Sequence, residues 1–174
     1  MTALATIRRA TPEDAPLVAT FAAKAFYDAY AHANDPSDMA LHLKNTFSPD
    51  RQRAEILSAK THFLLACIGN EIAGYAWMRE DISHDTIASA KNYELRRFYI
   101  GKPWHGQGVA AQLMTVTLDL ARDAHARGVW LTAWALNPRA LRFYQKQGFA
   151  DVGESTFLLG SDLQTDRVLV HPLR

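Results

Sequence analysis

The chain has 174 residues, 48% of them hydrophobic, which suffices to bury a full core and favours a single domain over residues 1–174. Its 19 basic and 18 acidic side chains give a formal net charge of +1 without a run of like charges, which argues against nucleic acid and membrane surfaces as partners. No stretch reaches the roughly 18 apolar residues of a membrane span, and the one cysteine, Cys67, cannot form an intramolecular disulfide. We therefore expect a cytoplasmic location, with Cys67 as a buried structural thiol.

Capping residues and apolar periodicity predict a strand, three helices and a hairpin in the first half of the chain. The first helix starts at Thr11 and Pro12 and extends to about Tyr30. Gly69 and Asn70 separate two apolar runs and indicate a two-residue hairpin turn. The expected elements are a strand at 6–10, helices at 11–30, 35–47 and 48–60, and strands on either side of the 69–70 turn.

The second half alternates strands and helices. A strand at 93–100 leads into a turn that contains proline and glycine, and the helix that follows ends near Gly128. The predicted apolar face of this helix comprises Val109, Leu113, Val116 and Leu120. The remaining elements are strands at 129–134, 149–160 and 165–173, a helix from Asn137 to Gly148, and a long loop at 81–92. The fold class is therefore α/β, with helices flanking a mixed sheet around a central β-turn-α-β unit.

The turn lies in FYIGKPWHGQGVAAQLM, residues 98–114, and we compared it with known phosphate-binding patterns. A Walker-type loop requires Gly-Lys-Ser/Thr, but Gln107 follows Gly106, which excludes that pattern. GQGVAA fits the dinucleotide pattern Gly-x-Gly-x-x-Gly/Ala, but five residues separate Ile100 from Gly106, and no carboxylate closes the next strand. Dinucleotide binding therefore stays a minor alternative, and the turn taken alone could equally be a connector between two elements.

HGQGVA at 105–110 and FYQKQGF at 143–149, with Asn137 and Ala140 ahead of the second motif, resemble the signature of the Gcn5-related N-acetyltransferase (GNAT) family. The resemblance covers residues 93–150. His105 departs from it, because the family usually has Gln or Arg at that position. The resemblance implies a mixed, mostly antiparallel sheet flanked by helices, with a splayed central strand pair.

The same resemblance implies acetyl-CoA as cosubstrate. It would place the pyrophosphate on the backbone amides of residues 106–111 and the pantetheine arm along the strand at 98–100. The implied cofactor-binding residues are Phe98, Tyr99, Ile100, His105, Gly106, Gln107, Gly108, Val109, Ala110, Ala111, Asn137 and Tyr144. Asn137 is also the expected N-cap of its helix.

Two residues are candidates for catalysis. The resemblance places Tyr144 near the thioester sulfur, where a tyrosine hydroxyl can protonate the departing thiolate. Glu94 resembles the glutamate that serves as base in histone-type members, which takes a proton from the acceptor ammonium. The alternative for Tyr144 is packing onto the sheet, and the alternative for Glu94 is an exposed strand-end residue paired with Arg96 or Lys91.

The segments AYAHANDPSDMALHL, FSPDRQRAEIL and FLLGSDLQTDRVLV resemble small bacterial polyamine N-acetyltransferases of the spermine/spermidine type. The expected function is direct transfer of an acetyl group from acetyl-CoA to the primary amine of a small molecule, with a polyamine as the suggested acceptor. Protein or peptide N-acetylation is one alternative, and a non-catalytic module that binds acyl-CoA or a polyamine is another. A homodimer is left open.

Two further sets of residues lie outside these motifs, the histidines and the aromatic residues of the first helix. His32 and His42 lie on separate predicted segments, and the histidines show no metal-ligand spacing, so no metal is expected. Phe26, Tyr27 and Tyr30 recur at helical spacing, which is more typical of a core face than of a substrate pocket. The resemblance implies that the first two helices form one wall of the acceptor site, so an exposed member of this set could line that site.

Overall fold

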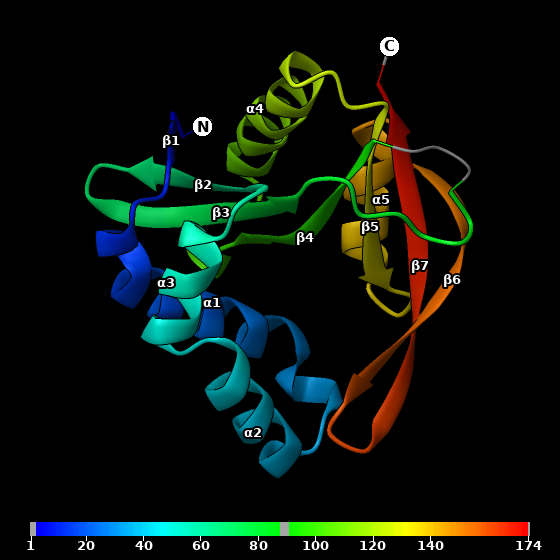
Figure 1. The fold of residues 1–174 in the computed structure, drawn as a ribbon. Helices are drawn as coiled ribbons and strands as arrows, with labels where there is room; N and C mark the ends of the chain where they lie inside the picture. The colour runs from blue at the N-terminus through cyan, green and yellow to red at the C-terminus, as the bar shows by residue number, and fades with distance from the viewer. Residues whose placement is uncertain (1–2, 88–90, 174) are drawn as a thin grey trace.

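Helices cover both faces of a mixed sheet in the computed structural model, which describes residues 3–87 and 91–173 (Figure 1). The strands of these residues are β1 (Thr6–Arg9), β2 (Thr61–Ile68), β3 (Glu71–Arg79), β4 (Asn92–Ile100), β5 (Gly128–Trp134), β6 (Ala150–Leu159) and β7 (Asp162–Pro172). They form one sheet in the order β1-β2-β3-β4-β5-β7-β6. All neighbours are antiparallel except β4 and β5, which are parallel, and the predicted fold class is confirmed.

The α-helices of the described residues are α1 (Ala15–Tyr30), α2 (Pro36–Thr46), α3 (Pro49–Leu57), α4 (Val109–Asp123) and α5 (Pro138–Lys146). Asp35, Ser48 and Asn137 cap the starts of α2, α3 and α5 by accepting backbone N–H bonds at 2.8, 3.2 and 3.1 Å, and a proline follows each cap. These local signals explain why the predicted starts agree with the structure. None of the described helices is both long and apolar enough to cross a membrane.

Several details of the sequence prediction were wrong. The helix expected to end near Gly128 stops at Asp123, because His125 has a left-handed backbone (φ 59°) and Gly128 already begins β5. Val116 is 37% exposed, so the buried face of α4 runs through Thr117 instead. Cys67 is half-buried rather than buried. Of the loop expected at 81–92, residues 88–90 lie outside the described residues, and position 92 belongs to β4.

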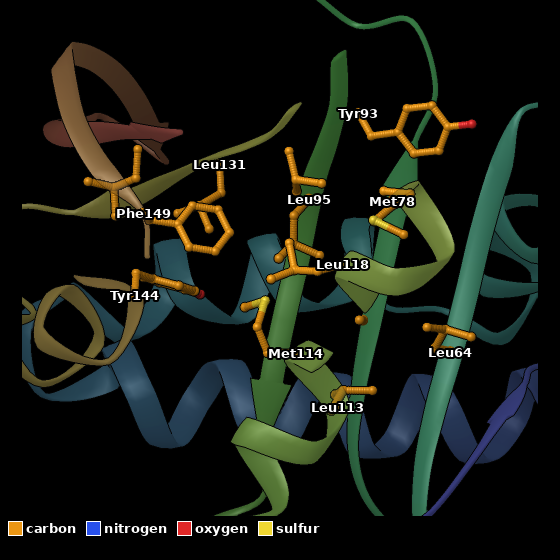
Figure 2. Close-up of a cluster of buried hydrophobic side chains, with 14 of the residues drawn as sticks. Leu64, Met78, Tyr93, Leu95, Leu113, Met114, Leu118, Leu131, Tyr144 and Phe149 are labelled. Carbon is orange, nitrogen blue, oxygen red and sulfur yellow. The ribbon is translucent and has the colours of Figure 1, made fainter. Parts of the chain in front are cut away.

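Two apolar cores hold the sheet between its helices. On one face, the α4 residues Leu113, Met114 and Leu118 pack over the sheet residues Leu95 and Leu131 (Figure 2). On the other face, buried side chains beneath α1 and α2 form the second core, which includes Val18, Phe26, Met39, Phe63, Leu65 and Tyr75. Each fully buried Leu or Phe contributes about 1.5–3 kcal/mol, so both cores support the strands on which the site is built.

The parallel strands β4 and β5 separate soon after they start. They pair only from Asn92 with Gly128 to Glu94 with Trp130, whereas β5 pairs with β7 on its other edge along its whole length. A bulge in β4 accompanies the separation, because Arg97 pairs with Trp77 while Leu95 pairs with the next residue of β3, which leaves Arg96 as an extra residue. The splayed strand pair implied by the resemblance is therefore present.

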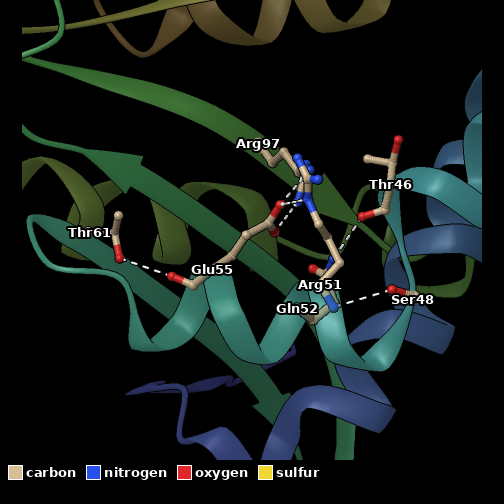
Figure 3. A network of polar contacts seen from close by, with 7 residues as sticks. All are labelled: Thr46, Ser48, Arg51, Gln52, Glu55, Thr61 and Arg97. Atoms are coloured by element: carbon tan, nitrogen blue, oxygen red, sulfur yellow. Dashed lines mark hydrogen bonds and ion pairs between the residues drawn. The ribbon is translucent and has the colours of Figure 1, made fainter.

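A buried ion pair joins α3 to β4 near this opening (Figure 3). Arg97 donates from Nη1 to Glu55 Oε2 at 2.6 Å and from Nη2 to Oε1 at 3.2 Å. The guanidinium also lies 4.7 Å from the centre of the Trp77 ring. Because both charges are buried and mutually satisfied, the pair fixes the direction of the Arg97 side chain.

Candidate active site

A cavity of about 490 Å³ occupies the space between the diverging ends of β4 and β5. Its walls come from α1, β4, the turn before α4, the first turn of α4, β5 and α5. Most of the predicted cofactor-binding residues line it, namely Phe98, Tyr99, Ile100, His105, Gly106, Gly108, Ala110, Ala111, Asn137 and Tyr144. Gln107 and Val109 do not line it, because the Gln107 side chain turns back to the Pro103 carbonyl (2.7 Å) and Val109 is buried in the core. We call this space the donor cavity.

Two glycines shape the turn at the end of the donor cavity. Gly106 and Gly108 have left-handed backbones, with φ of 74° and 82°, which a residue with a side chain adopts only with strain. A Cβ at Gly106 would meet no atom within 4 Å, so the turn is open on that side. Gly108 is the N-cap of α4, and helix geometry leaves the first backbone N–H groups of α4 without an intrahelical acceptor. These amides, with the positive end of the helix dipole, give the turn the chemistry of an anion site.

His105 has a structural role at the position where the resemblance is broken. Arg139 donates a hydrogen bond to Nδ1 (2.8 Å), and Nε2 contacts the Ile100 carbonyl oxygen (2.9 Å). The imidazole therefore links β4 to α5 across the turn. Burial, with the nearby charges of Arg139 and Lys102, lowers the pKa of His105. The positive charge at this end of the cavity comes instead from the lining residues Lys102, Arg139 and Lys146.

Asn137 and Tyr144 each combine packing with access to the cavity. Asn137 caps α5 as predicted and also lines the donor cavity. The Tyr144 ring packs edge-on against Phe98 and Phe149, with centroid distances of 6.3 and 5.7 Å. Burial and then the neighbouring Tyr99 raise the pKa of the Tyr144 phenol, so its hydroxyl keeps its proton at neutral pH.

Glu94 is buried next to two arginines. Its side chain is buried, not exposed as the alternative interpretation expected, and it contacts Arg79 on β3 and Arg96 on β4. Arg79 donates from Nε at 2.7 Å and also from Nη2, whereas Arg96 Nη1 lies 3.5 Å away. The predicted pairing with Arg96 is thus present as the longer contact. Glu94 is absent from the described lining of the donor cavity, and a role as base stays a prediction.

A second cavity of about 110 Å³ adjoins the first, and we call it the acceptor cavity. Residues of the diverging strands and of α1 line both spaces, namely Tyr30, Arg96, Arg97, Tyr99, Thr132 and Trp134. The remaining walls come from α1, α2, β6 and β7. The two cavities therefore meet where β4 and β5 have separated.

The acceptor cavity contains two aromatic residues of the first predicted helix and one carboxylate. Phe26 and Tyr30 pack in the second core, as expected, and also line this cavity, which the family resemblance allowed, whereas Tyr27 is 54% exposed and belongs to neither core. Asp166 on β7 also lines it and was not considered. Strand alternation could have found this carboxylate, because Asp166 lies on the same face of β7 as the buried Val168.

Comparison with known proteins agrees with this geometry. Residues 22–149 match the Acetyltransferase (GNAT) family. The chain is 34% identical to an uncharacterized N-acetyltransferase of Mycobacterium bovis, over 92% of this chain and 98% of the relative, and 28% identical to one of Lactobacillus delbrueckii subsp. lactis, over 94% of each.

Solved structures share the fold at low sequence identity. The PaiA N-acetyltransferase of Thermoplasma acidophilum, solved in complex with coenzyme A, has a TM-score of 0.81 at 17% identity and covers 97% of this chain and 99% of its own. YncA of Salmonella typhimurium, solved with acetyl-CoA, has a TM-score of 0.70 at 18% identity, and the match covers 98% of this chain and 95% of YncA. On the match over residues 22–149 and the 34% identity, this chain belongs to the GNAT family of N-acetyltransferases.

Proposed function

We propose that this protein transfers the acetyl group of acetyl-CoA to the primary amine of a small molecule by direct attack. The observation that carries the proposal is the junction of a donor cavity, which ends in an anion-binding turn, with a separate acceptor cavity at the strand opening. Two reactants can therefore meet between β4 and β5 without a covalent enzyme intermediate. Cys67, the one thiol of the described residues, lies on β2 and lines neither cavity.

The donor cavity fits acetyl-CoA by its own chemistry. The amides at the start of α4, with Lys102, Arg139 and Lys146, suit the phosphate groups. The edge of β4 that faces β5 after Glu94 has no strand partner, so its backbone groups are available to an amide-bearing arm. When bound, acetyl-CoA supplies the thioester, and in this proposal Tyr144, which lines the same cavity, gives a proton to the sulfur that leaves.

The acceptor class is the finer part of the proposal. The sequence resemblance to polyamine acetyltransferases supports a polyamine as acceptor. The acceptor cavity is small and lined by aromatic residues, which suits the end of an alkylamine. A peptide amine is the second candidate, because an amine at the end of a chain could enter the same opening.

A thiol-release assay tests the proposal directly. The protein is incubated with acetyl-CoA and, in separate reactions, with spermidine, a monoamine and a lysine-containing peptide, and free CoA is measured. We expect release above the rate of spontaneous hydrolysis with the small amines, and mass spectrometry should find the acetylated amine. Release only with the peptide would shift the assignment to protein acetylation. Tight CoA binding without release from any amine would leave a binding module.

A further inference from the structure

The acceptor cavity combines aromatic rings with one carboxylate. Phe26 and Tyr30 lie with ring centres 4.6 Å apart, and Tyr30 lies 5.8 Å from Trp134. Among the described lining residues, Asp166 is the one acidic side chain. Aromatic faces and a carboxylate both attract a cation, so the cavity has the chemistry of an ammonium site.

Asp166 is buried without an opposite charge in contact. The residue is 9% exposed, and no ion pair within 4.0 Å among the described residues includes its carboxylate. Burial raises the pKa of Asp166, and a hydrogen bond from Thr132 and the more distant charge of Arg96 only partly oppose this effect. A buried carboxylate in this state is costly to the fold, and a ligand cation would supply the missing charge.

The two arginines of the acceptor cavity have carboxylates of their own. Arg97 makes two hydrogen bonds to Glu55, and Arg96 contacts Glu94 at 3.5 Å. Neither arginine forms an ion pair with Asp166, so its carboxylate remains available to a ligand.

The other titratable groups that face Asp166 are neutral at physiological pH. Burial and the charge of Arg97 lower the pKa of His42 on α2, so its imidazole stays uncharged. The neighbouring Tyr99 and then burial raise the pKa of Tyr30, and burial raises the pKa of Tyr99. Both phenols therefore keep their protons, and none of these groups competes with a ligand for the carboxylate.

Tyr30 connects this carboxylate to the donor side. Tyr99, Tyr144 and Asp166 all raise the pKa of the Tyr30 phenol, and Tyr30 itself lines both cavities. An amine that rests on Asp166 therefore lies next to the opening through which the thioester would be reached. Glu94 has no such position, because it lines neither cavity and is held by two arginines.

We propose that Asp166 binds the ammonium group of the acceptor and takes the proton that the amine must lose before it attacks. The proposal rests on the acetyltransferase function proposed above and assigns the acceptor side of that site. The acceptor is then an alkylamine whose ammonium end enters an aromatic cavity, rather than a group recognised through the arginines.

The proton transfers balance as follows. Asp166 takes one proton from the ammonium, and the freed nitrogen lone pair forms the C–N bond to the acetyl carbon while the C–S bond breaks. Tyr144 gives its proton to the sulfur and is reprotonated by the second proton that leaves the nitrogen. Asp166 then loses its proton to solvent, so each turnover yields the amide, the thiol and one released proton.

The test compares Asp166→Asn with Asp162→Asn, a matched change at the exposed start of the same strand. Spermidine and phenethylamine are titrated by calorimetry into each protein saturated with CoA, where no acetyl group is present and no turnover occurs. We expect amine affinity to fall at least about 10-fold in Asp166→Asn and to be unchanged in Asp162→Asn. CoA affinity should be equal in both variants, which also checks that they are folded.

Steady-state rates give the second measurement. The rates are measured between pH 6 and 10. Asp166→Asn should reduce kcat/KM for the amine about 100-fold near neutral pH. The difference from the wild-type protein should become smaller at higher pH, because more of the amine is then already deprotonated in solution. Unchanged amine affinity, or no amine binding to the wild-type protein, would overturn the proposal, and a constant rate ratio across pH would overturn its proton-transfer step. If the wild-type protein releases no CoA although amine affinity still depends on Asp166, the proposed acetyl transfer fails and the ammonium site stands.

Discussion

Tyr144 shows how one side chain can pack in a core and also line a cavity. Its ring belongs to the core beneath α5, yet it also lines the donor cavity, so the two interpretations of the sequence describe different parts of the same residue. Burial raises the pKa of the phenol, which means that the hydroxyl is a proton donor at neutral pH and not a phenolate.

Tyr144→Phe should therefore separate the two roles. The phenyl ring preserves the contacts with Phe98 and Phe149, while the proton donor is lost. We expect turnover to fall about 10- to 1000-fold with acetyl-CoA affinity unchanged, measured by thiol release and calorimetry. Tyr27→Phe, on the exposed face of α1, is the control and should match the wild-type rate. Equal turnover in Tyr144→Phe would leave only the packing role.

Glu94 illustrates the opposite case, because its contacts come from a residue on the neighbouring strand β3 that the local sequence does not contain. Arg79 lies directly opposite Glu94 in the β3–β4 register, and this pairing depends on the bulge in β4. The two arginines occupy the carboxylate that the base hypothesis needs free.

We expect Glu94→Gln to act mainly on stability. The amide leaves Arg79 without its buried counterion, which should lower the free energy of unfolding by about 1–3 kcal/mol in urea denaturation. Glu71→Gln, at the exposed start of β3, should change it by less than about 0.5 kcal/mol. The ratio of mutant to wild-type rate should stay constant with pH. A loss confined to the low-pH limb would instead restore Glu94 as the base, and a raised KM alone would indicate a substrate anchor.

At the scale of elements, the sequence predicted what short-range signals determine. The starts of α2, α3 and α5 follow from a capping residue and a proline, and the turn before α4 follows from its two glycines. The donor cavity is therefore largely predictable, because most of its residues fall in two short segments around 95–111 and 132–147, and its remaining wall comes from the end of α1. The end of α4 was not predictable, because the non-glycine His125 takes a left-handed backbone there.

The turn itself can be tested with Gly108→Glu. A side chain and a negative charge at the start of α4 should oppose the phosphates, and we expect acetyl-CoA affinity to fall by more than about 100-fold in calorimetry. The left-handed backbone adds a folding cost of about 1–3 kcal/mol. Gly69→Glu has the same strain in the hairpin turn between β2 and β3, where a side chain meets no atom within 4 Å, and should keep wild-type affinity. Equal affinities in the two variants would contradict the phosphate assignment.

At the scale of the whole molecule, the acceptor cavity depends on contacts that no local pattern contains. Its walls come from α1, α2 and four strands, which are up to 140 residues apart from Phe26 to Asp166. Helical periodicity favoured the core for Phe26 and Tyr30 but cannot distinguish a core from the wall of a cavity, and only the family resemblance suggested a wall. The sheet that brings these segments together also explains why the site is open: β4 and β5 share only three residue pairs.

This narrow junction predicts how acetyl-CoA should affect the folded protein. A ligand in the donor cavity contacts both β4 and β5, so it should bridge the strands beyond Glu94, where no hydrogen bonds join them. At 100 times its Kd, binding adds about 2.7 kcal/mol of stability by mass action, which corresponds to a rise in Tm of about 5–10 °C for a chain of this size.

A rise in Tm does not show where the ligand binds, so hydrogen exchange is the decisive measurement. Amides at residues 95–100 of β4 and 131–134 of β5 should exchange more slowly with ligand, while those at the β6–β7 turn near Asp162 should not change. Gly108→Glu should abolish both effects, and a rise in Tm without protection at the two strand ends would mean that the ligand binds elsewhere.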